Sequence, residues 1–133
     1  MVRIVLDTNI LVSGLLYNGK PRKLLDLAVN GKMELVSSTE LIDELGEVLA
    51  REKFGLSKDE QAVMVDFVIR LSKIIALKSK FKAVKEDPDD DIVINTAYDG
   101  DADYIVTGDR AILALKKFGK TSIVKASEML NYF

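Results

Sequence analysis

The sequence has no cysteine and no histidine among its 133 residues. Without cysteine the chain has no disulfide framework and no thiolate metal site. The absence of histidine removes the most common zinc ligand and the usual general base near neutral pH. Any chemistry that this chain performs must therefore use carboxylates, amides, hydroxyls and amines.

Long hydrophobic runs are also absent. No stretch approaches the roughly 20 apolar residues that a membrane-spanning helix needs. The N-terminal apolar run is too short for a signal peptide and is interrupted by Asp7. We therefore expect a cytoplasmic protein with no membrane partner. The net charge of −2 neither indicates nor excludes nucleic acid, because the distribution of charge matters more than its sum.

The composition is that of a soluble globular protein, with 48% hydrophobic and 30% charged residues. We expect a single domain over residues 1–133, long enough to bury a substantial core. Apolar runs alternate with amphipathic segments, which predicts a parallel sheet covered by helices on both faces. The predicted strands are 2–6, 33–36, 74–77, 104–107 and 122–124, and the predicted helices are 9–16, 24–28, 41–49, 57–72, 89–98, 112–117 and a last helix from Ser127.

Two of the predicted strands close on a carboxylate, at Asp7 and, two residues beyond the second strand, at Asp109. In a parallel sheet both strand ends lie at one edge, where α/β proteins place their ligands. The acidic run 89–91 stands at a predicted helix N-terminus, which favours negative charge. Glu44 lies on a helix that follows a strand and is a fourth candidate for the same edge.

Carboxylates that converge in a partly desolvated cleft repel one another strongly unless a cation lies between them. Mg²⁺ or Mn²⁺ suits a site of carboxylates and water, whereas zinc and iron usually recruit histidine or cysteine. Such sites commonly serve phosphoryl chemistry. Each acid also has a plainer explanation, as a helix cap, a solvated helix start or an exposed helix residue. The joint pattern, rather than any single acid, favours a metal site.

The ordered set of motifs resembles the PIN domain ribonucleases, in particular their VapC-like toxin branch. The resemblance covers essentially the whole chain. It rests on Leu6-Asp7-Thr8-Asn9, on Glu44-Leu45 within residues 40–49 followed by Arg51, on Asp87-Pro88-Asp89-Asp90-Asp91, and on residues 102–109. It implies a three-layer α/β/α sandwich around a mainly parallel sheet of four to five strands.

The resemblance also implies a site and an activity. Metal-dependent hydrolysis of RNA phosphodiester bonds would use Mg²⁺ or Mn²⁺ and a metal-bound water, without a covalent intermediate. The toxin branch further implies a homodimer and an antitoxin that covers the site. The implied metal ligands and catalytic residues are Asp7, Glu44, Asp90 and Asp109, with Asn9 and Thr107 as supporting polar groups and Asp91 as the alternative to Asp90 if the alignment slips by one residue.

Two roles come from the residues themselves rather than from the resemblance. Thr8 and Asn9 are expected to cap the helix that follows Asp7. A set of lysines is the best candidate for contact with RNA phosphates, although a solvated basic face explains the lysines equally well. These lysines are Lys78, Lys80, Lys82 and Lys85, of which the first three alternate and share one face if the chain is extended.

Two other functions remain open on the sequence. A catalytically silent PIN-like module would bind RNA or a protein through the same edge, and the presence of all four acids weighs against it. A Mg²⁺-dependent aspartyl phosphotransfer or receiver-type domain would be phosphorylated on a strand-end aspartate such as Asp7. Such domains usually need a lysine at another strand end, and the sequence places none there clearly.

Overall fold

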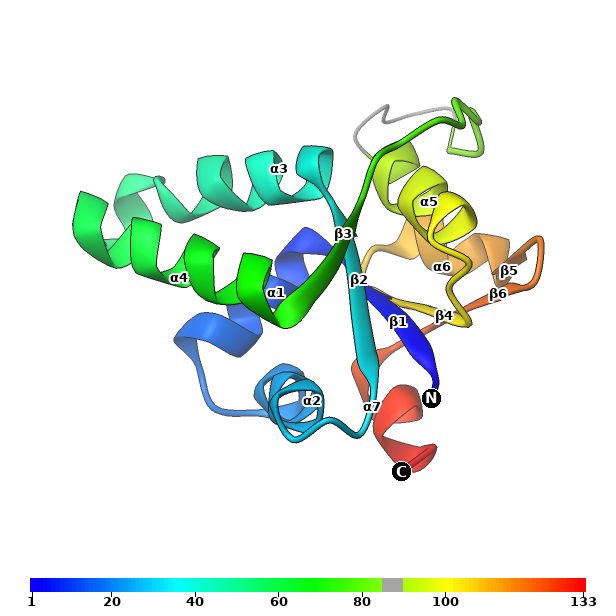
Figure 1. The fold of residues 1–133 in the computed structure, drawn as a ribbon, viewed down its shortest axis with the longest axis horizontal. Coiled ribbons are helices and arrows are strands. Elements are labelled where there is room, and N and C mark those ends of the chain that lie inside the picture. Colours follow the sequence, from blue (N-terminus) through cyan, green and yellow to red (C-terminus); the bar gives the residue numbers. More distant parts are fainter. Residues whose placement is uncertain (85–89) are drawn as a thin grey trace.

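The computed structural model describes residues 1–84 and 90–133, which form an α/β domain (Figure 1). The strands are β1 (Arg3–Leu6), β2 (Glu34–Ser38), β3 (Ser72–Ile75), β4 (Tyr104–Val106), β5 (Lys117–Phe118) and β6 (Thr121–Val124). The helices are α1 (Thr8–Leu16), α2 (Lys20–Val29), α3 (Thr39–Leu49), the short 3₁₀ helix η1 (Glu52–Phe54), α4 (Lys58–Leu71), α5 (Asp90–Asp99), α6 (Arg110–Leu115) and α7 (Ala126–Asn131).

The six strands form one sheet in the order β3-β2-β1-β4-β6-β5. All neighbouring strands are parallel except β5, which pairs antiparallel with β6. In Figure 1, α1 to α4 lie on one side of the sheet, and α5 and α6 lie on the other. The expected three-layer sandwich around a mainly parallel sheet is therefore confirmed, with six strands rather than four to five.

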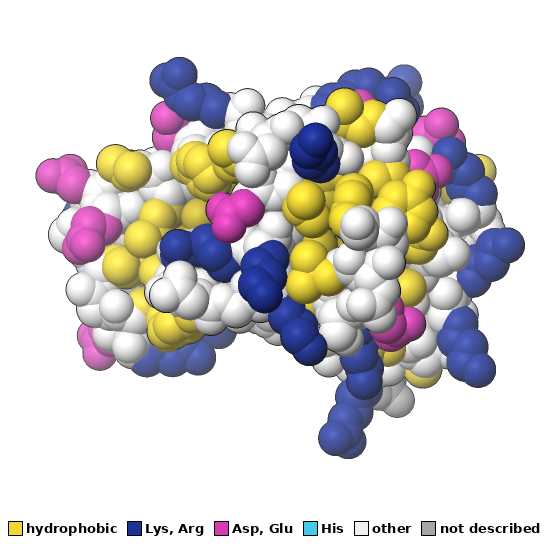
Figure 2. Space-filling view, turned by 90° about the horizontal axis from the view of Figure 1, so that it is seen from below, with side chains coloured by type: hydrophobic (Ala, Val, Ile, Leu, Met, Phe, Trp, Pro, Cys, Tyr) yellow, Lys and Arg dark blue, Asp and Glu magenta, His cyan; other side chains and the backbone are white. Residues whose placement is uncertain are grey.

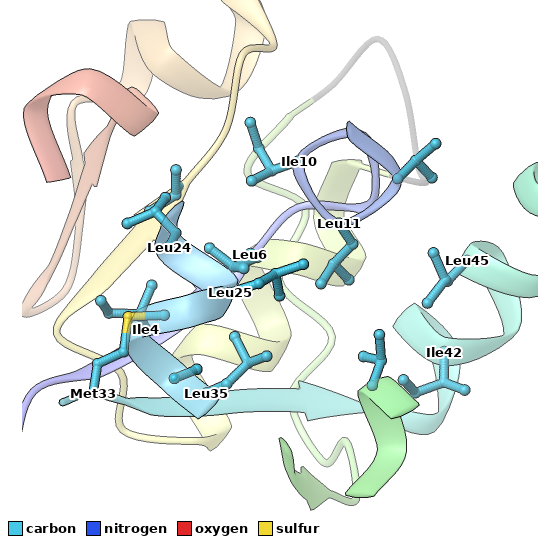
Figure 3. Close-up of a cluster of buried hydrophobic side chains, with 14 of the residues drawn as sticks. Ile4, Leu6, Ile10, Leu11, Leu24, Leu25, Met33, Leu35, Ile42 and Leu45 are labelled. Atoms are coloured by element: carbon cyan, nitrogen blue, oxygen red, sulfur yellow. The ribbon is translucent and has the colours of Figure 1, made fainter. Parts of the chain in front are cut away.

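Strand β1 lies at the centre because its side chains are apolar on both faces. Ile4 and Leu6 belong to the hydrophobic cluster shared with α1 to α4, as Figure 3 shows. Val5 points to the opposite face and packs in the cluster shared with α5 and α6. All three residues are buried, so β1 reads as a continuous apolar run, as a strand covered on both faces should.

Local capping residues set the starts of α3 and α4. Helix α2, in contrast, begins at Lys20, four residues before the helix predicted at 24–28. Ser38 accepts a hydrogen bond from the N–H of Leu41 at the start of α3. Ser57 and Glu60 form a capping box at the start of α4, in which each side chain accepts a hydrogen bond from the other residue's N–H. No helix in the described part of the chain is long and apolar enough to span a membrane.

The C-terminal part departs from the prediction at two places. The helix expected at 112–117 begins earlier, at Arg110, because Asp109 accepts hydrogen bonds from the N–H groups of Ala111 and Ile112. It also ends earlier, since Lys116 adopts a positive φ of 60° and the chain turns into β5, a strand that the sequence analysis missed.

Candidate active site

The candidate site lies between β1 and β4, where the chain changes direction across the sheet. From β1 the chain passes outward to β2 and β3, then returns to β4 on the other side of β1. Leu6 and Val106 are register partners, so Asp7 and Thr107 follow directly from paired residues at the carboxyl ends of the two strands. Open α/β sheets hold their ligands at such a reversal of strand order.

Asp7 is fixed by hydrogen bonds to both carboxylate oxygens. One oxygen accepts from the N–H of Thr8 at 2.8 Å and caps α1, and the other accepts from the Thr107 hydroxyl at 2.7 Å. The expectation that Thr8 and Asn9 cap this helix was wrong, because Asp7 itself caps it. The Thr8 hydroxyl is buried and has no hydrogen-bond partner among the described residues, while the Asn9 side chain is exposed.

Burial raises the pKa of the Asp7 carboxyl, since desolvation disfavours the charged form. The hydrogen bonds from Thr107 and Thr8 oppose this increase, and the negative charge of nearby Asp109 adds to it. The pKa of Asp7 therefore lies above its usual value. Such a carboxylate gains stability when a cation binds beside it.

Thr107 connects the two strand-end acids. Its buried hydroxyl donates to Asp7 and accepts from the N–H of Asp109 at 3.0 Å. Asp109 in turn caps α6. The structure therefore brings Asp7, Thr107 and Asp109 together. The sequence analysis had named Thr107 as a supporting residue from the family resemblance, and the structure shows the contacts through which it can act.

The remaining predicted acids lie on α3 and α5, on the flanks of this edge. Glu44 is partly buried on α3 and lines a hollow that Ile92 of α5 also borders. Asp90 is the first residue of α5 and is half-buried. Asp91 accepts a hydrogen bond from the N–H of Val84 at 2.8 Å, so its carboxylate already holds a neighbouring segment.

Comparison with known proteins assigns the family. The family model of the PIN domain matches residues 3–111, most of the chain and both strand-end acids. The chain belongs to the PIN domain family. An uncharacterized protein from Methanocaldococcus jannaschii, MJ1680, is 31% identical over 124 residues, covering 90% of this chain and 78% of the relative.

Solved structures share the fold of this PIN domain. VapBC2 from Rickettsia felis, bound to a DNA fragment from its promoter, aligns with a TM-score of 0.67 at 18% identity over 92% of this chain and 97% of the other. PAE2754 from Pyrobaculum aerophilum aligns with a TM-score of 0.65 at 16% identity, over 98% of this chain and 88% of the other. FitAcB from Neisseria gonorrhoeae aligns with a TM-score of 0.61 at 18% identity, over 93% of this chain and 98% of the other.

The donor atoms of this PIN domain suit a hard divalent cation. Asp7 and Asp109 supply carboxylate oxygens, and the Asp7 carboxylate is desolvated. The chain contains no cysteine thiolate and no histidine imidazole. Within residues 1–84 and 90–133, no three acidic side chains stand close enough together to hold a metal ion as they lie. The convergence of Asp7, Glu44, Asp90 and Asp109 on one cation therefore stays a prediction.

The predicted lysines lie in the segment before α5. Lys78, Lys80 and Lys82 are exposed and alternate along a stretch without regular secondary structure. Lys85 lies outside the described residues, as do Asp87, Pro88 and Asp89 of the acidic motif. The contact of these lysines with RNA likewise stays a prediction.

The raised pKa of Asp7 predicts a pH-dependent effect on stability in the metal-free protein. An acid whose pKa is higher in the folded state than in the unfolded state binds its proton more tightly in the folded protein. The folded state therefore loses stability as the pH rises through the interval between the pKa of the unfolded state and that of the folded state. Asp7→Asn removes this cost. We expect the variant to unfold with a higher free energy than the wild type at pH 7, and the difference to shrink as the pH falls toward 4.

Urea titrations of both proteins from pH 4 to pH 8, with chelator present, measure this difference. Subtracting the wild-type curve removes the contributions of the other carboxylates, such as Asp101, whose pKa is lowered by the hydrogen bond and charge of Lys120. A difference that does not change with pH would contradict a raised pKa for Asp7.

Proposed function

We propose that this PIN domain is a divalent-metal-dependent ribonuclease, the toxin component of a toxin–antitoxin pair. The observation that supports the nuclease most directly is the pair Asp7 and Asp109 at the reversal point of the sheet, linked through the Thr107 hydroxyl. Membership of the PIN domain family and the shared fold with VapBC2 agree with this function.

In this proposal Asp7, Glu44, Asp90 and Asp109 would hold Mg²⁺ or Mn²⁺, with Asp91 as the alternative to Asp90. A bound cation of this kind polarises a phosphate oxygen and lowers the pKa of a water molecule. The chain supplies the rigid frame for these ligands. Thr107 fixes the orientation of the Asp7 carboxylate, and the N-terminus of α6 fixes that of Asp109.

The chain also supplies a candidate for proton transfer. Glu44 would act as a ligand or as the base that accepts a proton from the attacking water, since a general base must lie within hydrogen-bond reach of that water. No side chain of the site needs to form a covalent intermediate. Asn9 and Thr107 would act as polar groups that support the ligands rather than as reacting groups.

The proposed activity is tested with purified protein and a labelled single-stranded RNA. We expect cleavage with added Mg²⁺ or Mn²⁺, complete loss of cleavage with chelator, and recovery when the metal is restored. The Asp7→Asn protein, purified in parallel, controls for contaminating ribonuclease. Cleavage that persists in chelator would refute the proposal, and absence of cleavage under all conditions would favour the catalytically silent binding module.

The proposal includes two protein partners, an antitoxin and a second copy of the chain. Figure 2 shows a face of the molecule on which hydrophobic side chains gather between lysines and arginines. Exposed apolar residues near the ends of α2 and α7 include Val29, Tyr132 and Phe133. Exposed apolar areas of this kind are typical of protein contacts. The third possibility, aspartyl phosphotransfer, loses support because the chain belongs to the PIN domain family.

A further inference from the structure

Residues 78–84, here called the basic strap, have no regular secondary structure but lie in a defined path along α5. Three side chains of α5 hold the strap: Asp91, Asn95 and Asp99. They are spaced at i, i+4 and i+8, which places them on one face of the helix over successive turns. The strap is thus fixed by side chains rather than by pairing with the sheet.

The C-terminal end of α5 holds the start of the strap. One Asp99 oxygen accepts hydrogen bonds from the N–H groups of Lys78 and Ser79, at 2.7 and 2.8 Å. The other Asp99 oxygen accepts from the Ser79 hydroxyl. Burial alone would raise the pKa of Asp99, but the hydrogen bonds from Ser79 and Lys78 outweigh it and lower the pKa, so this carboxylate is charged and occupied at neutral pH.

The middle and end of the strap are held in the same way. Buried Asn95 accepts from the N–H of Phe81 at 2.8 Å and donates to its carbonyl oxygen at 3.1 Å. Asp91 accepts from the N–H of Val84 at 2.8 Å. The strap therefore runs antiparallel to α5, and its last residue, Val84, is held by Asp91, which follows the proposed metal ligand Asp90 in the first turn of the helix.

Three aromatic rings meet beside the strap. Phe81 of the strap lies 4.7 Å from Tyr98 of α5 and 5.2 Å from Phe118 of β5, measured between ring centroids. The turn after β5 also lies against Tyr98. A Cβ atom placed on Gly119 in this turn would be 3.8 Å from the Tyr98 ring. Tyr98 remains 52% exposed and Phe81 39% exposed, so these rings present aromatic surface to solvent.

Exposed lysines are sequence neighbours of two of these rings. Lys80 and Lys82 stand on either side of Phe81, and Lys117 precedes Phe118; all three are exposed. The nearby acids already have partners, because Asp99 holds the strap and Asp101 pairs with Lys120 at 2.9 Å. The surface therefore combines exposed rings with an excess of positive charge.

We propose that the strap and the three rings form a binding surface for single-stranded RNA that leads into the acidic site. Bases would stack on the exposed rings of Phe81 and Tyr98, which Phe118 supports from the core side. Lys80, Lys82 and Lys117 would contact phosphates. Proteins that bind single strands without sequence preference combine these two elements, a positive track and aromatic rings for stacking. The identity of the ligand as RNA rests on the proposed function.

The charge distribution favours RNA over a protein partner at this surface. Burying the rings against an apolar protein surface would desolvate the lysines around them, whereas a polyanion with planar bases satisfies both features. The position also suits a substrate track. Tyr98 lies near the C-terminal end of α5, seven residues after Asp91, so the strap leads from the rings to the acidic end of the helix over a rise of about 10 Å.

The test measures binding separately from cleavage, by fluorescence anisotropy of a labelled single-stranded RNA in chelator and low salt. We expect Lys80→Glu combined with Lys82→Glu to weaken binding by about 10-fold or more and to reduce the dependence of the affinity on salt. The matched control is Lys53→Glu combined with Lys58→Glu, two exposed lysines near the start of α4. This pair should change the affinity much less.

A second variant tests stacking. Tyr98→Leu keeps apolar contact with Phe81 but removes the aromatic face, and we expect about 5-fold weaker binding of RNA, with no change for inorganic polyphosphate. Tyr98→Phe should bind RNA as the wild type does. Circular dichroism and thermal unfolding confirm that each variant is folded.

The outcomes separate this inference from the proposed function. If the wild type cleaves RNA while the strap variants and Tyr98→Leu bind RNA normally, the nuclease stands and the RNA surface is refuted in favour of a protein contact. Equal weakening by both lysine pairs would also refute it, since the attraction would then be unspecific. If binding depends on the strap but no cleavage occurs with metal, the surface stands and the nuclease fails.

Discussion

Replacing Asp7 with asparagine should lower the rate of metal-dependent RNA cleavage by at least about 100-fold. Losing a residue that only supports a metal ligand costs up to about 100-fold in activity, and the loss of a direct ligand such as Asp7 should cost at least as much. Asp7 is the acid held most firmly in the site, by hydrogen bonds from Thr8 and Thr107. Asparagine keeps the size of the side chain and one carbonyl oxygen that can still cap α1, but it loses the charge that a divalent cation requires.

Single-turnover cleavage of a labelled RNA measures the effect, and the matched control is Asp26→Asn, an exposed aspartate on α2. The control should cleave at the wild-type rate. Because burial raises the pKa of Asp7, the Asp7→Asn protein should be at least as stable as the wild type without metal. A folded Asp7→Asn protein with unchanged activity would remove Asp7 from the site and contradict the proposed function.

Gly100→Ala should destabilise the protein by about 1–3 kcal/mol, the usual cost of forcing an extra methyl group into a packed interior. Gly100 lies where the chain leaves α5 for β4. A Cβ there would lie 2.5 Å from Cγ1 of Val36 in β2 and 2.9 Å from the carbonyl oxygen of Thr96. The Thr96 oxygen is part of the helix backbone and accepts from the N–H of Gly100, so it cannot move aside without loss.

Gly46→Ala provides the opposite control within the same fold. Gly46 lies within α3, and a Cβ there would meet no atom within 4 Å. Alanine should therefore stabilise the protein by about 0.5–1 kcal/mol, because glycine loses more backbone entropy than alanine in a helix. Urea unfolding measures both variants. A neutral Gly100→Ala would mean that α5 can move away from β2 at little cost.

The sequence predicted the layers of the fold because its hydrophobic pattern is unambiguous. The apolar run of β1 and the long amphipathic helix α4 are local signals, and the strand and helix predicted at 2–6 and 57–72 were both confirmed. Strand β5 was missed because two residues carry no recognisable period. It exists only through pairing with β6, with Lys117 opposite Ser122 and Phe118 opposite Thr121, after a turn whose Gly119 has a φ of 59°.

The site was predictable in outline but not in its contacts. Strand ends place Asp7 and Asp109 at one edge, as expected for parallel strands. The hydrogen bond from Thr107 to Asp7 joins residues 100 positions apart, and its geometry depends on the register of two strands, which the sequence does not specify. The role of Asn95 could not be predicted for the same reason. Its side chain lies in an apolar stretch of sequence, and only the folded structure shows that the buried amide binds the backbone of the strap.

The two edges of the sheet bear on how the protein resists aggregation. Exposed strand edges can pair with other chains, and short strands and lysines on an edge oppose this. The outer strands here are β3, with four residues, and β5, with only two. Each carries an exposed lysine, Lys73 on β3 and Lys117 on β5. Both ends of the sheet are therefore poor templates for strand addition, which opposes aggregation through edge-to-edge pairing of strands.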